Sequence, residues 1–209
     1  RTYANIMKYI RMGTSSNFGN MLTMAIASVF LPFLPLTAVQ VLINNMLYDL
    51  SQIGIPFDRA DGSDLARPRG WDMGALVRFT FIMGPLSSIF DIATFVALMK
   101  IFHVDVATFR AAWFIESMAT QILVVFIIRT ASRFWQDRPH PMLAATALLC
   151  LATALILPYW PIAALLGFAG PSIAVLGAIA ALVLLYLAGA EVLKLSLIHI
   201  SEPTRQAEI

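Results

Sequence analysis

The chain has 209 residues, of which 59% are hydrophobic and only 12% are charged, and its formal net charge is +2 at pH 7. A soluble domain carries roughly a quarter charged residues, so this composition excludes a soluble globular fold and indicates an integral membrane protein in contact with lipid. The small net charge gives no reason to expect a nucleic-acid partner. Cys150 is the only cysteine, which excludes an intrachain disulfide.

Six apolar stretches predict an all-α membrane protein, a bundle of six transmembrane helices. Each stretch approaches the roughly 20 helical residues that cross a hydrocarbon core, and the continuous apolar runs exclude an alternating β pattern. The predicted spans lie near residues 14–34, 36–53, 74–98, 112–130, 141–158 and 171–193. Residues 1–13 are then expected to form a cytoplasmic stalk, and residues 14–194 the six-helix domain.

Positive charges predict that both termini are cytoplasmic. One side of the predicted bundle carries Arg1, Lys8, Arg11, Arg59, Arg67, Arg69, Arg78, Arg129, Arg133, Arg138 and Lys194, and the other carries Lys100 and Arg110. Lys and Arg concentrate in cytoplasmic loops, which gives the orientation. The four tryptophans, Trp71, Trp113, Trp135 and Trp160, lie near predicted helix ends, where indole rings favour the membrane interface.

The second span contains an unusual polar stripe. Asn45, Asp49 and Gln52 are four and three residues apart, so on a helix their side chains share one face. An ionisable group within a membrane span is costly to keep there, and by default it indicates a functional site.

A tight turn between the first two spans gives this stripe an expected partner. Pro32 and Pro35 cannot continue a helix, and residues equally far from the turn at Leu34 should lie at equal depth in the two antiparallel helices. Depth matching pairs Asn20 with Asp49, Asn17 with Gln52, and Thr23 with Asn45. At 1.5 Å per residue these groups are expected roughly 20–25 Å from the external turn, in the cytoplasmic half of the membrane.

Residues 54–73 form the longest polar stretch. The spacing of Asp58, Asp61 and Asp64 misses the calcium-binding EF-hand pattern, and arginines are interleaved with these acids. We therefore expect a solvated connector here and not a metal site.

Two more acids lie within predicted spans, Asp91 in the third and Glu116 in the fourth. No Lys or Arg is near either acid in sequence. The functional interpretation of such an acid is a second, outer cation-attracting point or a proton-linked carboxylate, and the alternative is a structural acid hydrogen-bonded to serines or backbone. The pair Gly84-Pro85 in the third span predicts a kink, and the last two spans, which are rich in Ala and Leu, are expected to serve packing.

The two ends of the chain carry separate expectations. Residues 195–205 resemble the translation of a common transposase sequencing adapter, so residues 195–209 are expected to be a non-native tail. The chain begins with Arg1 and not with Met, and we expect that truncation produced this start.

Two motifs carry a resemblance to a known family. Ser-Ser-Asn-Phe-Gly-Asn at residues 15–20 and Asn-Met-Leu-Tyr-Asp at residues 45–49 resemble the fifth and sixth transmembrane helices of P-type ATPases. The closer resemblance is to bacterial magnesium-importing P-type ATPases, and it is carried by residues 1–9, 42–52, 67–72, 84–91 and 113–116. The likeness runs from residue 1 to about residue 194. It implies the C-terminal membrane region of such a pump, helices five to ten.

The resemblance implies roles for individual residues. Asn17, Asn20, Asn45 and Asp49 fall on cation-coordinating positions, and Glu116 falls on an acid of the eighth helix that some calcium pumps use. Calcium pumps have a carboxylate where this chain has Asn20. That departure suits Mg²⁺, a small hard ion that binds oxygen and keeps part of its water shell.

The function that the resemblance implies is ATP-driven import of Mg²⁺ across the bacterial inner membrane, through an aspartyl-phosphate. The Asp-Lys-Thr-Gly-Thr phosphorylation loop and the domain that binds Mg-ATP are not within these 209 residues. They would belong to an N-terminal half of the same polypeptide, so this fragment is not expected to be catalytic alone. The alternatives are a calcium or monovalent-cation pump, a gradient-driven secondary transporter in which Asp91 or Glu116 carries the proton, and a non-transporting scaffold.

Overall fold

A computed structural model describes residues 2–58, 73–130 and 133–206, and every regular element within these ranges is helical. The elements are α1 (Thr2–Phe30), α2 (Ala38–Ser51), η1 (Ile55–Phe57), α4 (Met73–Val96), η2 (Ala97–Ile101), α5 (Val106–Ile128), α6 (Pro141–Ile156), η3 (Leu157–Tyr159) and α7 (Ile173–Gln206). η2 is a π-helical continuation of α4, and η1 and η3 are 3₁₀ turns. The predicted all-α class is confirmed for the described part of the chain.

Within the described residues, four helices are long and apolar enough to cross a membrane. They are Leu76–Ile101, Val106–Ile128, Pro141–Tyr159 and Ile173–Ser196. α1 has 29 residues but carries polar side chains along its length, and the 14 residues of α2 reach only about 21 Å of the roughly 30 Å hydrocarbon core. The structure therefore supports a multi-pass membrane protein through these four helices.

The turn between α1 and α2 lies where the prolines predict it. α1 ends at Phe30, and a capping box then starts α2: the Thr37 hydroxyl accepts from the Gln40 backbone N–H (3.4 Å), and Gln40 Oε1 accepts from the Thr37 backbone N–H (2.8 Å). Gln40 Nε2 also donates to the carbonyl of Gly167 (3.1 Å), in the loop before α7. The start of α2 is thus fixed to the loop between α6 and α7.

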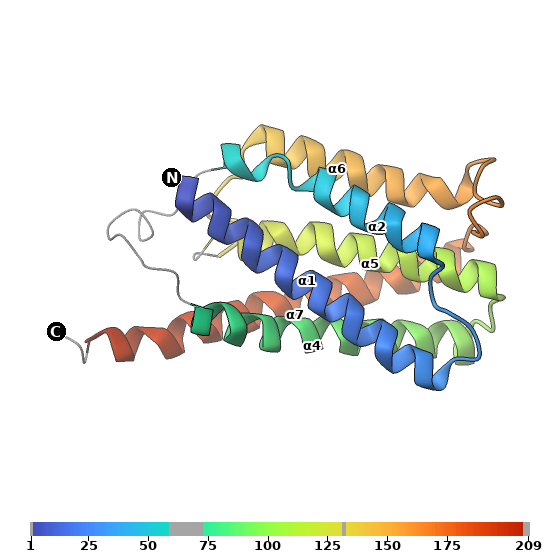
Figure 1. Ribbon diagram of the computed structural model, residues 1–209, viewed down its shortest axis with the longest axis horizontal. Coiled ribbons are helices and arrows are strands. Elements are labelled where there is room, and N and C mark those ends of the chain that lie inside the picture. The colour runs from blue at the N-terminus through green and yellow to red at the C-terminus, as the bar shows by residue number, and fades with distance from the viewer. Residues whose placement is uncertain (1, 59–72, 131–132, 207–209) are drawn as a thin grey trace.

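α5 forms the centre of the bundle (Figure 1) and is buried on almost every side. It begins at Val106, earlier than the predicted residue 112, because the Asp105 carboxylate accepts from the first-turn amide N–H groups and caps the helix. Its aromatic side chains Phe109 and Trp113 pack against Phe95 of α4. A helix surrounded by other helices can be apolar all round, as α5 largely is.

The prediction that all four tryptophans lie at the membrane interface is wrong for Trp113. Its indole is only 1% exposed and belongs to the core. Trp135 and Trp160 are exposed and lie shortly before α6 and directly after η3, and Trp71 lies outside the described residues. The prediction used only the distance of Trp113 from a predicted helix end, and that distance does not reveal that Phe95 of α4 packs against its ring.

Two glycines bring α1 and α4 close together. A Cβ on Gly19 would lie 3.2 Å from the carbonyl oxygen of Gly84, and a Cβ on Gly84 would lie 2.5 Å from the Phe18 ring. Ser88 donates a hydrogen bond across this contact to the Gly19 carbonyl (3.1 Å). Small residues and a hydroxyl bond are the usual means of close helix packing in membranes. α4 runs through Pro85 to Val96 without ending.

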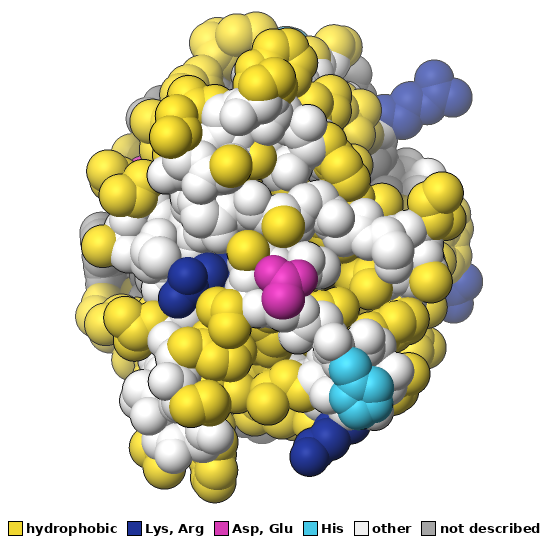
Figure 2. Space-filling model, turned by 90° about the vertical axis from the view of Figure 1, so that its right-hand side faces the viewer, with side chains coloured by type: hydrophobic (Ala, Val, Ile, Leu, Met, Phe, Trp, Pro, Cys, Tyr) yellow, Lys and Arg dark blue, Asp and Glu magenta, His cyan; other side chains and the backbone are white. Residues whose placement is uncertain are grey.

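The two ends of the bundle differ in what they carry. Both termini lie at one end, together with the connection between α5 and α6 (Figure 1). The opposite end carries the α1–α2, α4–α5 and α6–α7 connections, and its surface is mostly hydrophobic with few charged side chains (Figure 2).

Residue Asp58 does not behave as part of a solvated connector. Its side chain is 1% exposed and accepts two hydrogen bonds of 3.1 Å from Nη1 of buried Arg129, at the end of α5. It also accepts from the backbone N–H of His140 (3.1 Å), and Arg129 bonds the Asp137 carbonyl as well. The prediction is therefore wrong at Asp58, because a partner distant in sequence neutralises it. Residues 59–72 lie outside the described part of the chain.

Candidate cation site

Three asparagines predicted to bind a cation line one cavity. The cavity has a volume of about 480 Å³ and lies between α1, α2 and α5. Its polar lining consists of Asn17, Asn20, Asn44, Asn45 and Ser117, and we call it the amide cavity. Asn17 and Asn45 are exposed and Asn20 is half-buried, so the cavity opens to the surface of the described chain. The rest of the wall is apolar and includes the Trp113 ring.

Two of these lining residues were not predicted. Asn44 is 3% exposed, and its Oδ1 has no hydrogen-bond partner. Ser117 donates to Oδ1 of Asn20 at 3.5 Å and accepts from Nε2 of Gln121 at 2.6 Å. Both adjoin residues that the sequence had marked, Asn45 and Glu116, but a neighbouring position on a helix points about 100° away. Only the packing of α5 against α1 and α2 shows that they face the same space.

Asp49 does not line the amide cavity. It lines a second cavity, of about 710 Å³, nearer the end of the bundle that holds the termini. Asn5, Tyr9, Gln52 and Phe57 share its wall, and we call it the end cavity. Asn45 and Asp49 are four residues apart on one face of α2, so this face runs from one cavity to the other.

The predicted depth matching differs from the observed one. Tyr48 donates to the Ser16 hydroxyl across the two helices (3.1 Å), whereas pairing about Leu34 would have set Ser16 opposite Gln52. Thr23 does not face Asn45 but donates to Asp91 on α4 (2.6 Å). The reason is that α1 packs chiefly along α4 and diverges from α2, so equal distance from the turn does not give equal depth.

Asp91 and Glu116 form a buried acid pair next to the amide cavity. Asp91 is 1% exposed and accepts hydrogen bonds from Thr23 Oγ1 (2.6 Å) and from Trp113 Nε1 (2.8 Å). The Glu116 carboxyl is also 1% exposed and lies close enough to interact with the Asp91 carboxyl, and neither of its oxygens has a hydrogen-bond partner outside this pair. The Trp113 ring stands between this pair and the cavity, since it lines the cavity while its N–H faces Asp91.

The chemistry of the amide cavity is that of neutral oxygen ligands. Within the described residues, no group of three or more His, Cys, Asp or Glu side chains is placed to hold a metal ion. Carboxamide and hydroxyl oxygens suit a hard cation that keeps several of its waters, as Mg²⁺ does. They do not suit soft metals such as Cu(I), which select thiolate and thioether ligands.

Comparison with known proteins relates this chain to cation-transporting ATPases. Residues 33–196 match the family described as "Cation transporting ATPase, C-terminus". The chain is 42% identical over 171 residues to the "Magnesium-transporting ATPase, P-type 1" of Salmonella typhimurium strain 14028s. It is 40% identical over 171 residues to the protein of the same name from Escherichia coli K12. Each alignment covers 79% of this chain and 19% of the relative, so the chain spans about a fifth of the length of these curated relatives.

Proposed function

Because the chain belongs to the family of cation-transporting ATPases, whose C-terminal region it matches, we propose that it is the membrane part of an ATP-driven Mg²⁺ transporter. The full protein would import Mg²⁺ across the bacterial inner membrane. The relatives are named as magnesium-transporting P-type ATPases. The observation that carries the proposal is the amide cavity. Carboxamide and hydroxyl side chains from α1, α2 and α5 line this one cavity within an otherwise apolar bundle.

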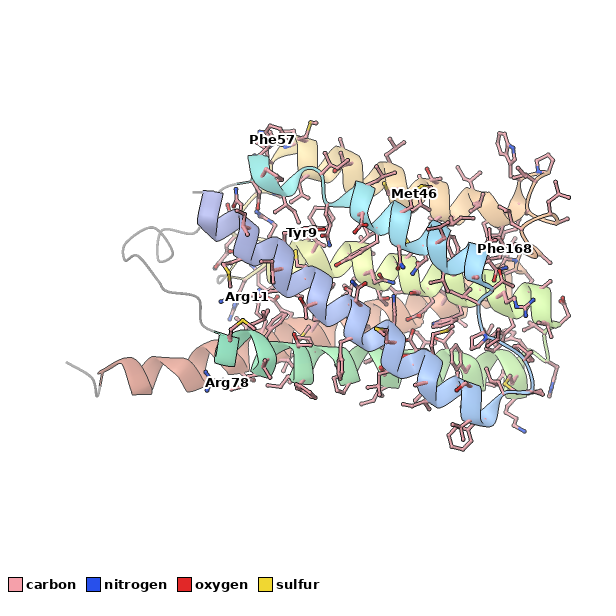
Figure 3. All side chains as sticks on the ribbon, in the orientation of Figure 1. Tyr9, Arg11, Met46, Phe57, Arg78 and Phe168 are labelled. Carbon is pink, nitrogen blue, oxygen red and sulfur yellow. The ribbon has the colours of Figure 1, made fainter. Side chains whose placement is uncertain are left out.

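The proposed topology has six membrane helices and cytoplasmic termini. α1 and α2 join the four apolar helices as the two spans that carry the polar site. The arrangement is supported by the shared position of both termini (Figure 1) and by Arg11 and Arg78 near that end (Figure 3). Arg129, which follows α5, lies at the same end, in line with the concentration of positive residues on the cytoplasmic side.

In this proposal the asparagines and Asp49 have different roles. Asn17, Asn20 and Asn45, joined by Asn44 and Ser117, provide neutral oxygens that replace part of the Mg²⁺ water shell. Asp49 lies one helical turn along α2 from Asn45 and provides negative charge that attracts the ion. The acid pair Asp91 and Glu116 would act on the same site from behind the Trp113 ring.

ATP chemistry would take place outside this chain. Mg-ATP binding and phosphorylation would belong to an N-terminal part of the same polypeptide, which the relatives' greater length allows. α1 is continuous from Thr2 to Phe30 and carries Asn17 and Asn20 midway. A tilt of its N-terminal turns would therefore move these two asparagines directly, which offers a mechanical route from phosphorylation to the site.

Replacing Asp49 by Asn tests the role of the charge. In the full-length protein, Asp49→Asn should lower Mg²⁺ uptake at limiting Mg²⁺ by about tenfold or more, the effect of losing about 1.4 kcal/mol of attraction. The control is Asp105→Asn, since Asp105 is an exposed cap that asparagine can replace. Uptake by Asp49→Asn equal to that of the control would refute the assignment.

A further inference from the structure

The end cavity holds polar groups that the amide cavity does not account for. It lies at the end of the bundle that carries the termini, and Figure 3 shows Tyr9 of α1 and Phe57 of η1 in that part of the molecule. Asp49 lines it, and Asn45, one turn away on the same face of α2, lines the amide cavity. An ion that moves along this face of α2 would meet the two cavities in succession.

Gln52 is the clearest sign that the end cavity receives a ligand. The residue is 3% exposed and lines the cavity. Its carboxamide lies beside the Tyr48 phenol, but neither Oε1 nor Nε2 makes a hydrogen bond of normal geometry. A buried amide without partners is unfavourable, and such groups in native structures usually bind water or an ion. Its position three residues after Asp49 sets the two side chains on the same face.

Asn5 contributes a second free oxygen to the same wall. Its Nδ2 donates to the carbonyls of Pro56 (3.0 Å) and Asp58 (3.2 Å), so the orientation of the carboxamide is fixed by two acceptors. The Oδ1 atom is then an acceptor, and it is buried without a partner. The residue as a whole is 6% exposed.

Asp49 gives this cavity its charge. Among the described residues, no Lys, Arg or His forms a salt bridge with Asp49, whereas Asp58 in the same wall is paired with Arg129. The His140 ring also lines the cavity. The oxygen donors of its wall are the carboxylates of Asp49 and of Asp58, which is paired with Arg129, together with the carboxamides of Asn5 and Gln52 and the phenol of Tyr9. This set of hard oxygen donors fits a partly hydrated divalent cation.

We propose that the end cavity is a second binding place for Mg²⁺, occupied between the amide cavity and the cytoplasm, with Gln52 and Asn5 as ligands beside Asp49. The proposal rests on the proposed function, because it takes Mg²⁺ as the transported ion. Gln52 and Asn5 are thereby additional binding residues, distinct from the asparagines of the amide cavity.

Protection of a cysteine by Mg²⁺ tests this proposal. In the full-length protein, in vesicles with the cytoplasmic face outward, Phe57→Cys places a thiol in the wall of the end cavity, and Met142→Cys is a control. Met142 lies on the first turn of α6 and is 44% exposed, compared with 57% for Phe57. Labelling by a cationic thiol reagent is followed at each cysteine by mass spectrometry. Mg²⁺ at ten times its half-protecting concentration should slow labelling of Phe57→Cys about tenfold by occupancy and leave Met142→Cys unchanged.

Variants of Gln52 test whether its side chain binds the Mg²⁺ ion. Gln52→Leu in the Phe57→Cys background should raise the half-protecting Mg²⁺ concentration about tenfold, and Gln52→Glu should lower it. Gln52→Leu removes a contact with the Tyr48 phenol but no hydrogen bond of normal geometry. An unchanged labelling rate of Met142→Cys when it is combined with Gln52→Leu confirms that the fold is intact. Asn20→Leu, which alters only the amide cavity, should leave the protection in place.

Two results would overturn the proposal: no Mg²⁺ protection of Phe57→Cys, or the same half-protecting concentration in Gln52→Leu. Loss of protection in Asn20→Leu together with its survival in Gln52→Leu would assign the effect to the amide cavity and would also overturn it. The proposed function is tested separately by uptake. Mg²⁺ uptake without protection refutes the end cavity alone, whereas protection without uptake refutes the transport function and leaves a cation site.

Discussion

Buried carboxamides with unsatisfied polar atoms are the feature of single residues that most directly points to ion binding. Asn44 and Gln121 near the amide cavity, and Asn5 and Gln52 in the end cavity, each keep at least one such atom among the described residues. An amide buried without a partner is unfavourable by about 1–3 kcal/mol. Four such groups in one small bundle are best explained by ligands that satisfy them, namely water and a hard cation.

Arg129 is a residue whose role is structural and whose loss should be severe. Arg129→Met should destabilise the protein by about 3–5 kcal/mol, because the buried Asp58 carboxylate would lose its ion pair with Arg129. The measurement is the midpoint of thermal unfolding in detergent. The double variant Arg129→Met with Asp58→Asn should recover much of the loss, since asparagine removes the charge and still accepts from the His140 N–H. A double variant no more stable than Arg129→Met would contradict this explanation.

At the level of helices, the sequence predicts where the helices and the first turn lie. It does not predict which residues of two neighbouring helices lie at the same depth. The described helices fall close to the predicted apolar spans, and the prolines correctly predict the turn after Phe30. The depth matching of α1 with α2 fails because contacts with α4, through Gly19 and Gly84, set the direction of α1. Such contacts join residues far apart in the chain, and periodicity carries no information about them.

The contact between α6 and the segment after α2 gives a test at this scale. A Cβ on Gly54 would lie 2.3 Å from Cα and 2.5 Å from N of Leu143, and these backbone atoms cannot move without displacing the start of α6. Gly54→Ala should therefore destabilise the protein by about 1–3 kcal/mol. Gly177→Ala is the matched control, because nothing lies within 4 Å of its added Cβ. Equal unfolding temperatures for the two variants would show that the contact is not tight.

For the whole molecule, sequence reasoning marks the polar residues that we propose to bind the cation, but it does not predict that they divide between two cavities. Asn17, Asn20 and Asn45 line one cavity, as expected if the resemblance assigns them to one site, but Asp49 lines the end cavity and not the space beside Asn20 that the depth matching predicted. The participation of Ser117 depends on α5, which is at the centre of the bundle only because other helices surround it. Asp91 and Glu116 meet for the same reason. A one-dimensional pattern can mark polar residues within spans, but tertiary packing decides which of them share a cavity.

The proposed orientation in the membrane predicts opposite accessibility at the two ends of the bundle. Met142 and Ile162 are similarly exposed, at 44% and 46%. Met142 is in the first turn of α6, and Ile162 lies three residues after η3 ends, so α6 separates the two positions. In the full-length protein, an impermeant thiol reagent should label Met142→Cys only in inside-out vesicles and Ile162→Cys only in intact cells. The reverse pattern, or labelling of both positions from one side, would refute cytoplasmic termini.

The central claim is that the amide cavity binds the transported Mg²⁺, and its most direct test is the Mg²⁺ concentration that half-saturates uptake by the full-length protein. Asn20→Leu removes one carboxamide from the cavity, and Met21→Leu alters an exposed apolar neighbour in the same wall. We predict that Asn20→Leu raises the half-saturating concentration by about tenfold or more, equivalent to at least about 1.4 kcal/mol of lost binding, while Met21→Leu leaves it unchanged. An unchanged half-saturating concentration in Asn20→Leu would contradict the claim.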